Sequence, residues 1–227
     1  MKYFLDHFFL AELNYTKELG FLKNKPYTCL QNKALENNQP ISIPYRRNKH
    51  PEKFIFTGNL SFNSGVLKAI RLFESLLDQY PNASMQIIGH APDKGFHQML
   101  QARVAKIKQI ELVGSEYPIG YDRIKEVILA GDVGFVTYQI NPSNESCIPT
   151  KVFEYLAYQL PFICQENSTW DVYANELGMS FSSDFNDLSF QSIVRWYEKI
   201  NFFYDNKPFL WESEEEKLLN TIDQVFN

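Results

Sequence analysis

Lys151 and Glu154 are two charged residues whose types and spacing could serve a binding site. They stand in the segment PTKVFE (149–154), where a proline followed by an apolar pattern predicts the first turn of a helix. Residues three apart share a helical face, so the two charges would project together. Lys151 could neutralise a phosphate. Glu154 could hold two ribose hydroxyls, because an ionised carboxylate has two oxygens that only accept hydrogen bonds. The alternative is a surface ion pair, worth roughly a few tenths of a kcal/mol.

A second polar turn, residues 57–65, reads TGNLSFNSG and leads from an apolar run into a helical pattern. Free N–H groups at a helix N-terminus favour an anion such as a diphosphate. An ordinary strand-to-helix loop has the same appearance, so both interpretations stay open. The spacing is not GxGxxG, and a dinucleotide-binding site is therefore not indicated.

Short apolar segments alternate with helical ones along most of the chain. The alternation predicts an α/β fold with a doubly wound, mostly parallel, Rossmann-like sheet. Ligands of such sheets bind beyond the carboxyl ends of the strands. The expected strands are 53–57, 85–88, 110–113, 133–138, 162–164 and 179–182. The expected helices are 66–79, 98–108, 122–130, 150–158, 170–177 and 187–204.

The two ends of the chain differ from this pattern. The first 19 residues predict an amphipathic helix, followed by a strand at 27–30 and a polar linker at 31–48. The segment 211–226 predicts a last helix with acidic residues in its first turn. The expected division is therefore an N-terminal remnant and linker (1–48), a Rossmann-like domain (49–205) and a C-terminal crossing helix (206–227).

Composition narrows the classes of protein. The 227 residues carry a formal net charge of −5 with mixed signs, and the absence of a basic stripe argues against nucleic acid as a partner. Three cysteines without CxxC spacing and four unpaired histidines favour neither a disulfide framework nor a metal site, so the expectation is a cytoplasmic protein without metal or cofactor. The apolar N-terminal stretch is too short and too charged for a membrane span.

The segment PTKVFEYLAYQLP (149–161) resembles the donor-site motif of GT-B retaining glycosyltransferases of the family 4 type. The order of the surrounding motifs is also similar, from FTGNL through QIIGHAP, IELVG and AGDVGFVTY to PFICQENSTW. The resemblance covers roughly residues 54–170. It implies the nucleotide-sugar-binding half of such an enzyme, with a nucleoside-diphosphate sugar, expected to be a UDP-sugar, as substrate.

The resemblance also implies roles for individual residues. Glu154 would hold the donor ribose and Lys151 would lie near the diphosphate. Gly58 and Asn59 match the turn that faces the diphosphate. Ser115 to Tyr117 match the stretch that meets the base. Glu145 and Ser146 lie where the donor sugar is usually bound.

Three departures from the family pattern affect these expectations. Eight residues separate Glu145 from Glu154, whereas the family motif has seven, so Glu145 is either a sugar ligand or a solvated loop acid. Asn59 and Ser64 stand where the family usually has an arginine and a lysine, which leaves diphosphate neutralisation mainly to Lys151 and helix dipoles. The length suits one of the two GT-B domains.

That length leaves several hypotheses open. The chain could be a truncated or shortened enzyme, or one half of a split enzyme that needs an acceptor-domain partner chain. The isolated chain is expected to bind a nucleotide sugar rather than to transfer the sugar alone. A full enzyme could also associate peripherally with membranes. A non-catalytic partner-binding module is the main alternative, and a GT-B-like epimerase or a methyltransferase is a weaker one.

Overall fold

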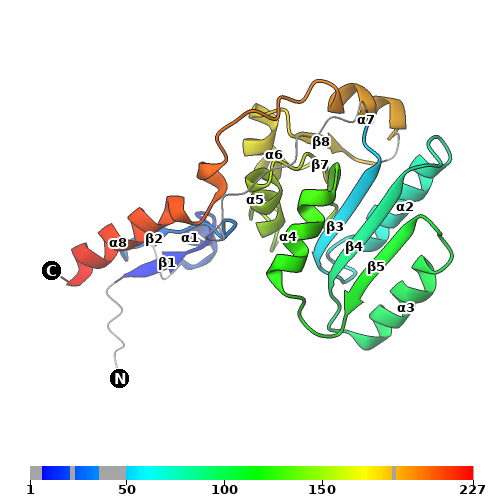
Figure 1. Cartoon of the computed structure of the whole chain (residues 1–227). Helices are drawn as coiled ribbons and strands as arrows, with labels where there is room; N and C mark the ends of the chain where they lie inside the picture. The colour runs from blue at the N-terminus through cyan, green and yellow to red at the C-terminus, as the bar shows by residue number, and fades with distance from the viewer. Residues whose placement is uncertain (1–6, 21–23, 36–49, 186–187, 227) are drawn as a thin grey trace.

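Six parallel strands form the central sheet of the computed structural model, which describes residues 7–20, 24–35, 50–185 and 188–226. The strands lie in the order β5-β4-β3-β6-β7-β8, and each neighbouring pair is parallel (Figure 1). Their bounds are β3 Lys53–Asn59, β4 Ser84–His90, β5 Ile110–Ser115, β6 Val133–Val136, β7 Phe162–Gln165 and β8 Ser180–Ser183. This order is that of a doubly wound Rossmann-like sheet, and the predicted fold class is confirmed.

Helices cover both faces of this sheet. Phe54 and Phe56 of β3 point to one face and Ile55 to the other, because side chains alternate along a strand. The first face is covered by α2 (Val66–Leu77), α3 (Lys94–Val104) and α7 (Phe190–Tyr197). The second is covered by α4 (Tyr121–Ala130), α5 (Thr150–Ala157) and α6 (Ser168–Glu176). Burial on both faces explains the nearly continuous apolar strands.

Two helices differ from their predicted bounds for local reasons. Helix α3 begins at Lys94, four residues early, because the Asp93 side chain caps it and accepts a hydrogen bond of 2.7 Å from the Phe96 amide. Helix α7 ends at Tyr197, seven residues short of the predicted end. The apolar residues beyond it, Ile200 and Phe202, pack against the core from a non-helical segment.

The order of the strands reverses between β3 and β6. These two strands pair over only two residues, Phe54 with Val133 and Ile55 with Gly134. The chain after β3 continues to β4 on one side of this point, and the chain after β6 continues to β7 on the other side. Their carboxyl ends therefore diverge, and a crevice for a ligand opens between the loops that follow them.

Gly65 lies where the loop after β3 contacts the loop after β6. It stands before α2 with a φ of 75°, and a Cβ built there would lie 1.6 Å from the Thr137 carbonyl oxygen. The Thr137 hydroxyl donates to the Gly65 carbonyl at 2.9 Å, and the Gln139 amide donates to the Asn63 carbonyl at 3.0 Å. Only a glycine allows so close an approach at this backbone angle.

Gly65→Ala is expected to destabilise the fold by about 3 kcal/mol or more, through left-handed strain and a backbone clash. Thermal and urea unfolding measure this loss. Gly120→Ala is the matched control, because Gly120 has a φ of −58° and nothing lies within 4 Å of a Cβ there. Equal stability of the two variants would contradict the role of Gly65.

A smaller group of elements lies beside the main sheet. Strands β1 (Phe8–Leu10) and β2 (Tyr27–Cys29) pair in parallel, with the short helix α1 (Tyr15–Glu18) between them. The last helix, α8 (Glu212–Phe226), follows a 3-10 turn at Lys207–Phe209 and lies against β2 (Figure 1). The two ends of the described chain are thus side by side.

The predicted N-terminal helix is wrong over Phe8–Leu10, and within the described residues of its range the helix is limited to α1. Phe8–Leu10 is a strand, as its aromatic residues favour. Most of the predicted linker, residues 36–48, lies outside the described residues. Its described part, residues 31–35, is anchored by a bridge between Ala34 and Leu210.

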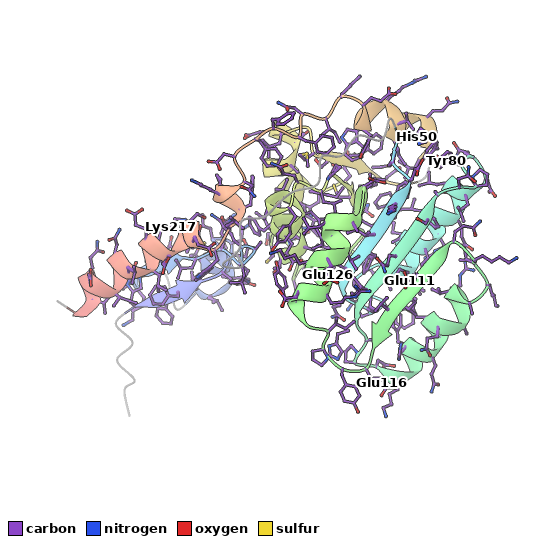
Figure 2. The ribbon with its side chains drawn as sticks, viewed as in Figure 1. His50, Tyr80, Glu111, Glu116, Glu126 and Lys217 are labelled. Carbon is purple, nitrogen blue, oxygen red and sulfur yellow. The ribbon has the colours of Figure 1, made fainter. Side chains whose placement is uncertain are left out.

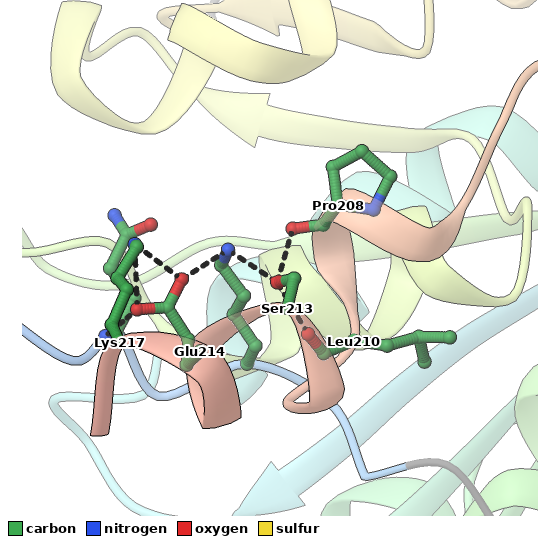
Figure 3. A network of polar contacts seen from close by, with 7 residues as sticks. Pro208, Leu210, Ser213, Glu214 and Lys217 are labelled. Atoms are coloured by element: carbon green, nitrogen blue, oxygen red, sulfur yellow. Dashed lines mark hydrogen bonds and ion pairs between the residues drawn. The ribbon is translucent and has the colours of Figure 1, made fainter. Parts of the chain in front are cut away.

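Glu214 fastens the two ends of the chain to each other. Its side chain is fully buried and accepts hydrogen bonds from the Gln31 amide at 3.3 Å and from Lys217 Nζ at 2.9 Å (Figure 3). Lys33 Nζ adds an ion pair at 2.5 Å. Burial acts to raise the pKa of Glu214, but the two lysines outweigh it and hold the pKa below its usual value.

Glu214→Ala would leave Lys33 without its buried partner, and the expected cost is about 3 kcal/mol. Hydrogen exchange should then accelerate in residues 27–35 and in α8, and much less in the main sheet. Glu215→Ala, an exposed neighbour on the same helix, serves as the control. Unchanged protection of α8 in Glu214→Ala would refute this role.

Candidate functional site

Lys151 lies at the switch point between β3 and β6, in the first turn of α5. Pro149 starts this helix, and its carbonyl accepts a hydrogen bond of 2.8 Å from the Val152 amide. The Lys151 residue is only 3% exposed, and Nζ lies 3.9 Å from the ring centroid of Phe56 and 4.7 Å from that of Tyr138. Among the described residues Nζ has no hydrogen-bond partner.

Burial without an acceptor has an electrostatic consequence. Aromatic faces attract a cation but do not replace its hydration. Burial therefore lowers the pKa of Lys151 to about 7, although the charge of Glu154 acts in the opposite direction. An anion brought to Nζ would restore the charge, so this lysine suits an anionic ligand.

Glu154 follows one helical turn later and is partly buried. Burial raises its pKa and Lys151 lowers it, but no ion pair joins the two within the described part of the chain. Tyrosines surround this carboxylate. Burial, and then the charge of Glu154, raise the pKa of Tyr121 and bring that of Tyr138 to about 12, so both phenols keep their protons.

The end of β3, which runs two residues beyond the predicted strand 53–57, approaches the same lysine. Gly58 has a φ of 96°, and a Cβ built on it would lie 3.9 Å from Lys151 Cε. The next residue, Asn59, lines the cavity described below. The structure thus brings Gly58 and Lys151 together, with Asn59 next to them in the chain.

Ser115 and Tyr117 lie at the same edge of the sheet, two strands away. Asn59 pairs with His90, and His90 pairs with Ser115, so the three strand ends are in register. Figure 2 shows Glu116 beyond the tip of β5, whereas His50 and Tyr80 lie at the opposite edge. The Glu116 carbonyl lies 3.0 Å from His90 Nε2, and Tyr117 is 76% exposed. These residues could reach a ligand only if it extends from Lys151 across β4.

Glu145 and Ser146 are held through their backbones. The Glu145 carbonyl accepts from Asn167 Nδ2 at 3.0 Å, and the Ser146 carbonyl accepts from Asn14 Nδ2 at 2.7 Å. The Glu145 side chain is exposed. Neither residue lines the cavity described in the next paragraph.

A cavity of about 420 Å³ opens between the loops after β3 and β6 and the segment before α1. Its lining is rich in amide and hydroxyl groups, and Glu12 is the only charged residue among the described residues that form it. The lining residues are Glu12, Tyr15, Asn32, Asn59, Ser61, Asn63, Ser64, Tyr138, Asn141, Ser143, Asn144, Cys147, Ile148, Pro149 and Thr150.

Sequence reasoning missed two contributors to this region. Tyr138 is the last residue of the predicted strand 133–138, and its place at a carboxyl end was the available signal. Glu12 carried no such signal, because its segment was expected to be an uninterrupted helix.

In the ranges that the structure describes, no three His, Cys, Asp or Glu residues are grouped so that they could hold a metal ion. Over the same ranges, no helix is long and apolar enough to cross a membrane.

The fold is similar to that of solved glycosyltransferases. The pneumococcal O-GlcNAc transferase GtfA, solved with UDP and GlcNAc, matches with a TM-score of 0.67 and 13% identity over 98% of this chain and 46% of its own. AviGT4, from avilamycin A biosynthesis, matches with a TM-score of 0.65 and 10% identity over 98% and 66%. Sucrose-phosphate synthase from Thermosynechococcus elongatus gives 0.65 and 12% over 98% and 59%.

The chain therefore has the fold of the C-terminal-like domain of GT-B glycosyltransferases. It spans about half to two thirds of the length of these relatives. No protein-family model and no curated protein sequence matches it.

Proposed function

We propose that this chain binds the nucleoside diphosphate of a UDP-sugar at the switch point and acts as the donor-binding half in sugar transfer. The observation that carries the proposal is the buried ammonium of Lys151, which has no acceptor among the described residues and lies over the rings of Phe56 in β3 and Tyr138 after β6. GtfA, a protein of the same fold, was solved in complex with UDP and GlcNAc, and this complex supports UDP as the nucleotide.

In this proposal the residues have separate roles. Lys151 and the backbone near Gly58 and Asn59 hold the diphosphate, and the N-terminus of α5 adds its dipole. Glu154 accepts the ribose hydroxyls, and residues 115–117 meet the base. By stabilising the departing diphosphate, these residues would contribute to the transfer of the sugar. We also propose that binding needs no metal or cofactor and that the protein acts in the cytoplasm. Residues 1–48 and 206–227 would lie beside an acceptor domain.

Calorimetric titration of the chain tests this proposal. Heat of binding is expected with UDP and UDP-sugars, and none with S-adenosylmethionine. Heat with S-adenosylmethionine and none with UDP at millimolar concentration would favour a methyltransferase and overturn the proposal.

A second candidate function is binding of a partner chain that carries the acceptor site. The group formed by β1, β2 and α8 exposes apolar side chains, and such patches mark interaction surfaces. These side chains include Phe9, Tyr27, Leu219 and Ile222. GtfA is also described in a GtfA/B complex. Light scattering with candidate acceptor-domain chains is the test, and a strict monomer in every mixture would count against it.

A further inference from the structure

Glu12 is a carboxylate that the structure carries into the cavity at the switch point from outside the main sheet. It stands between β1 and α1 and is only 9% exposed. Its Oε1 accepts a hydrogen bond of 2.9 Å from the Ile148 amide, in the loop that leads into α5. A second bond, from Asn14 Nδ2 to the Ser146 carbonyl at 2.7 Å, fixes the same segment against the same loop. The carboxylate is therefore held in place before any ligand binds.

The other oxygen of this carboxylate, Oε2, can accept further hydrogen bonds. No described residue donates a hydrogen bond to Oε2, while an ionised carboxylate can accept about four. Oε2 is not among the buried atoms without a partner, so it is open to the cavity, where a ligand hydroxyl can replace water as its donor.

The rest of the cavity indicates what kind of ligand group is bound. Its other walls are formed largely by asparagine and serine side chains, with no cation among the described lining residues. Such walls suit a neutral group with many hydroxyls. They do not suit a diphosphate, which the charge of Glu12 would repel. The diphosphate belongs beside Lys151, which does not line this cavity.

We infer that Glu12 accepts a hydrogen bond from a hydroxyl of the donor sugar and so helps to select that sugar. Glu145, the residue expected at the donor sugar, is exposed and does not line the cavity. The Ile148 amide orients the group and the Asn14 bond fixes the segment that carries it. This inference rests on the proposed function, because it concerns the sugar attached to the bound UDP.

The test compares UDP with UDP-glucose, UDP-galactose and UDP-N-acetylglucosamine on the wild-type chain and on Glu12→Gln. The amide keeps an acceptor for Ile148 but is a weaker acceptor for a hydroxyl. Affinity for the tightest-binding UDP-sugar should fall about tenfold, while affinity for UDP alone should change less than about twofold. Glu12→Ala should enlarge the selective loss, and Glu145→Gln should produce a smaller one than Glu12→Gln.

Each outcome is informative. A purely structural role for Glu12 would lower affinity for UDP and UDP-sugars by the same factor, along with the melting temperature, and would overturn the inference while leaving the proposed function intact. Unchanged affinities, or a larger selective loss in Glu145→Gln, would also overturn it. Failure of the wild-type chain to bind UDP would overturn the proposed function and the inference with it.

Discussion

Lys151→Met is expected to weaken UDP binding roughly 100-fold at pH 7, because the variant loses a charge-assisted contact to the diphosphate. Methionine fills similar volume between the Phe56 and Tyr138 rings, so the fold should persist. Calorimetry measures the affinity, and far-UV circular dichroism checks the fold. Retention of wild-type affinity would contradict a role for Lys151 in holding the nucleotide.

The same lysine predicts a pH dependence with a definite sign. With a pKa of about 7 in the free protein, Lys151 loses its proton as pH rises above 7, and UDP needs the protonated form. Wild-type affinity should therefore fall up to about tenfold per pH unit above 7, whereas Lys151→Met should show no such slope. The stability of the free wild-type chain should move the other way. Its folded pKa is lowered, so the unfolded state binds more protons and stability rises between about pH 7 and 10.5.

Glu154→Gln should weaken UDP binding roughly tenfold or more, because an ionised acceptor for the ribose hydroxyls becomes a neutral one. The loss should disappear when 2′,3′-dideoxy-UDP replaces UDP, since that ligand lacks the hydroxyls. This comparison separates the ribose contact from the effect of Glu154 on the charge of Lys151. Glu176→Gln, at the exposed end of α6, is the matched control. An equal loss with both nucleotides would show that Glu154 does not hold the ribose.

The main sheet was predictable because its signals are local. Each strand is a short apolar run with turn residues at its ends, and the α2 residues Ile70 and Phe73 mark a buried face by their spacing. The helix start at Pro149 and the spacing of Lys151 and Glu154 are equally local. The proximity of Gly58 to Lys151 follows from the sheet order, because β3 and β6 are neighbours at the switch point.

The N-terminal segment was not predictable in the same way. Whether Phe8–Leu10 becomes a strand depends on pairing with Tyr27–Cys29, a contact between separate parts of the sequence. The place of Glu12 depends on that pairing and on the distant Ile148 amide. The burial of Lys151 between two aromatic rings likewise requires the assembled sheet. The spacing of apolar residues along the sequence does not predict these contacts.

A crystal structure of the chain with UDP would show whether Lys151 holds the diphosphate. A phosphate oxygen is expected within about 3 Å of Lys151 Nζ, at the carboxyl ends of β3 and β6. The ribose hydroxyls are expected at Glu154 and the base beside residues 115–117. A nucleotide bound elsewhere, with Lys151 Nζ still buried and without an acceptor, would contradict the account.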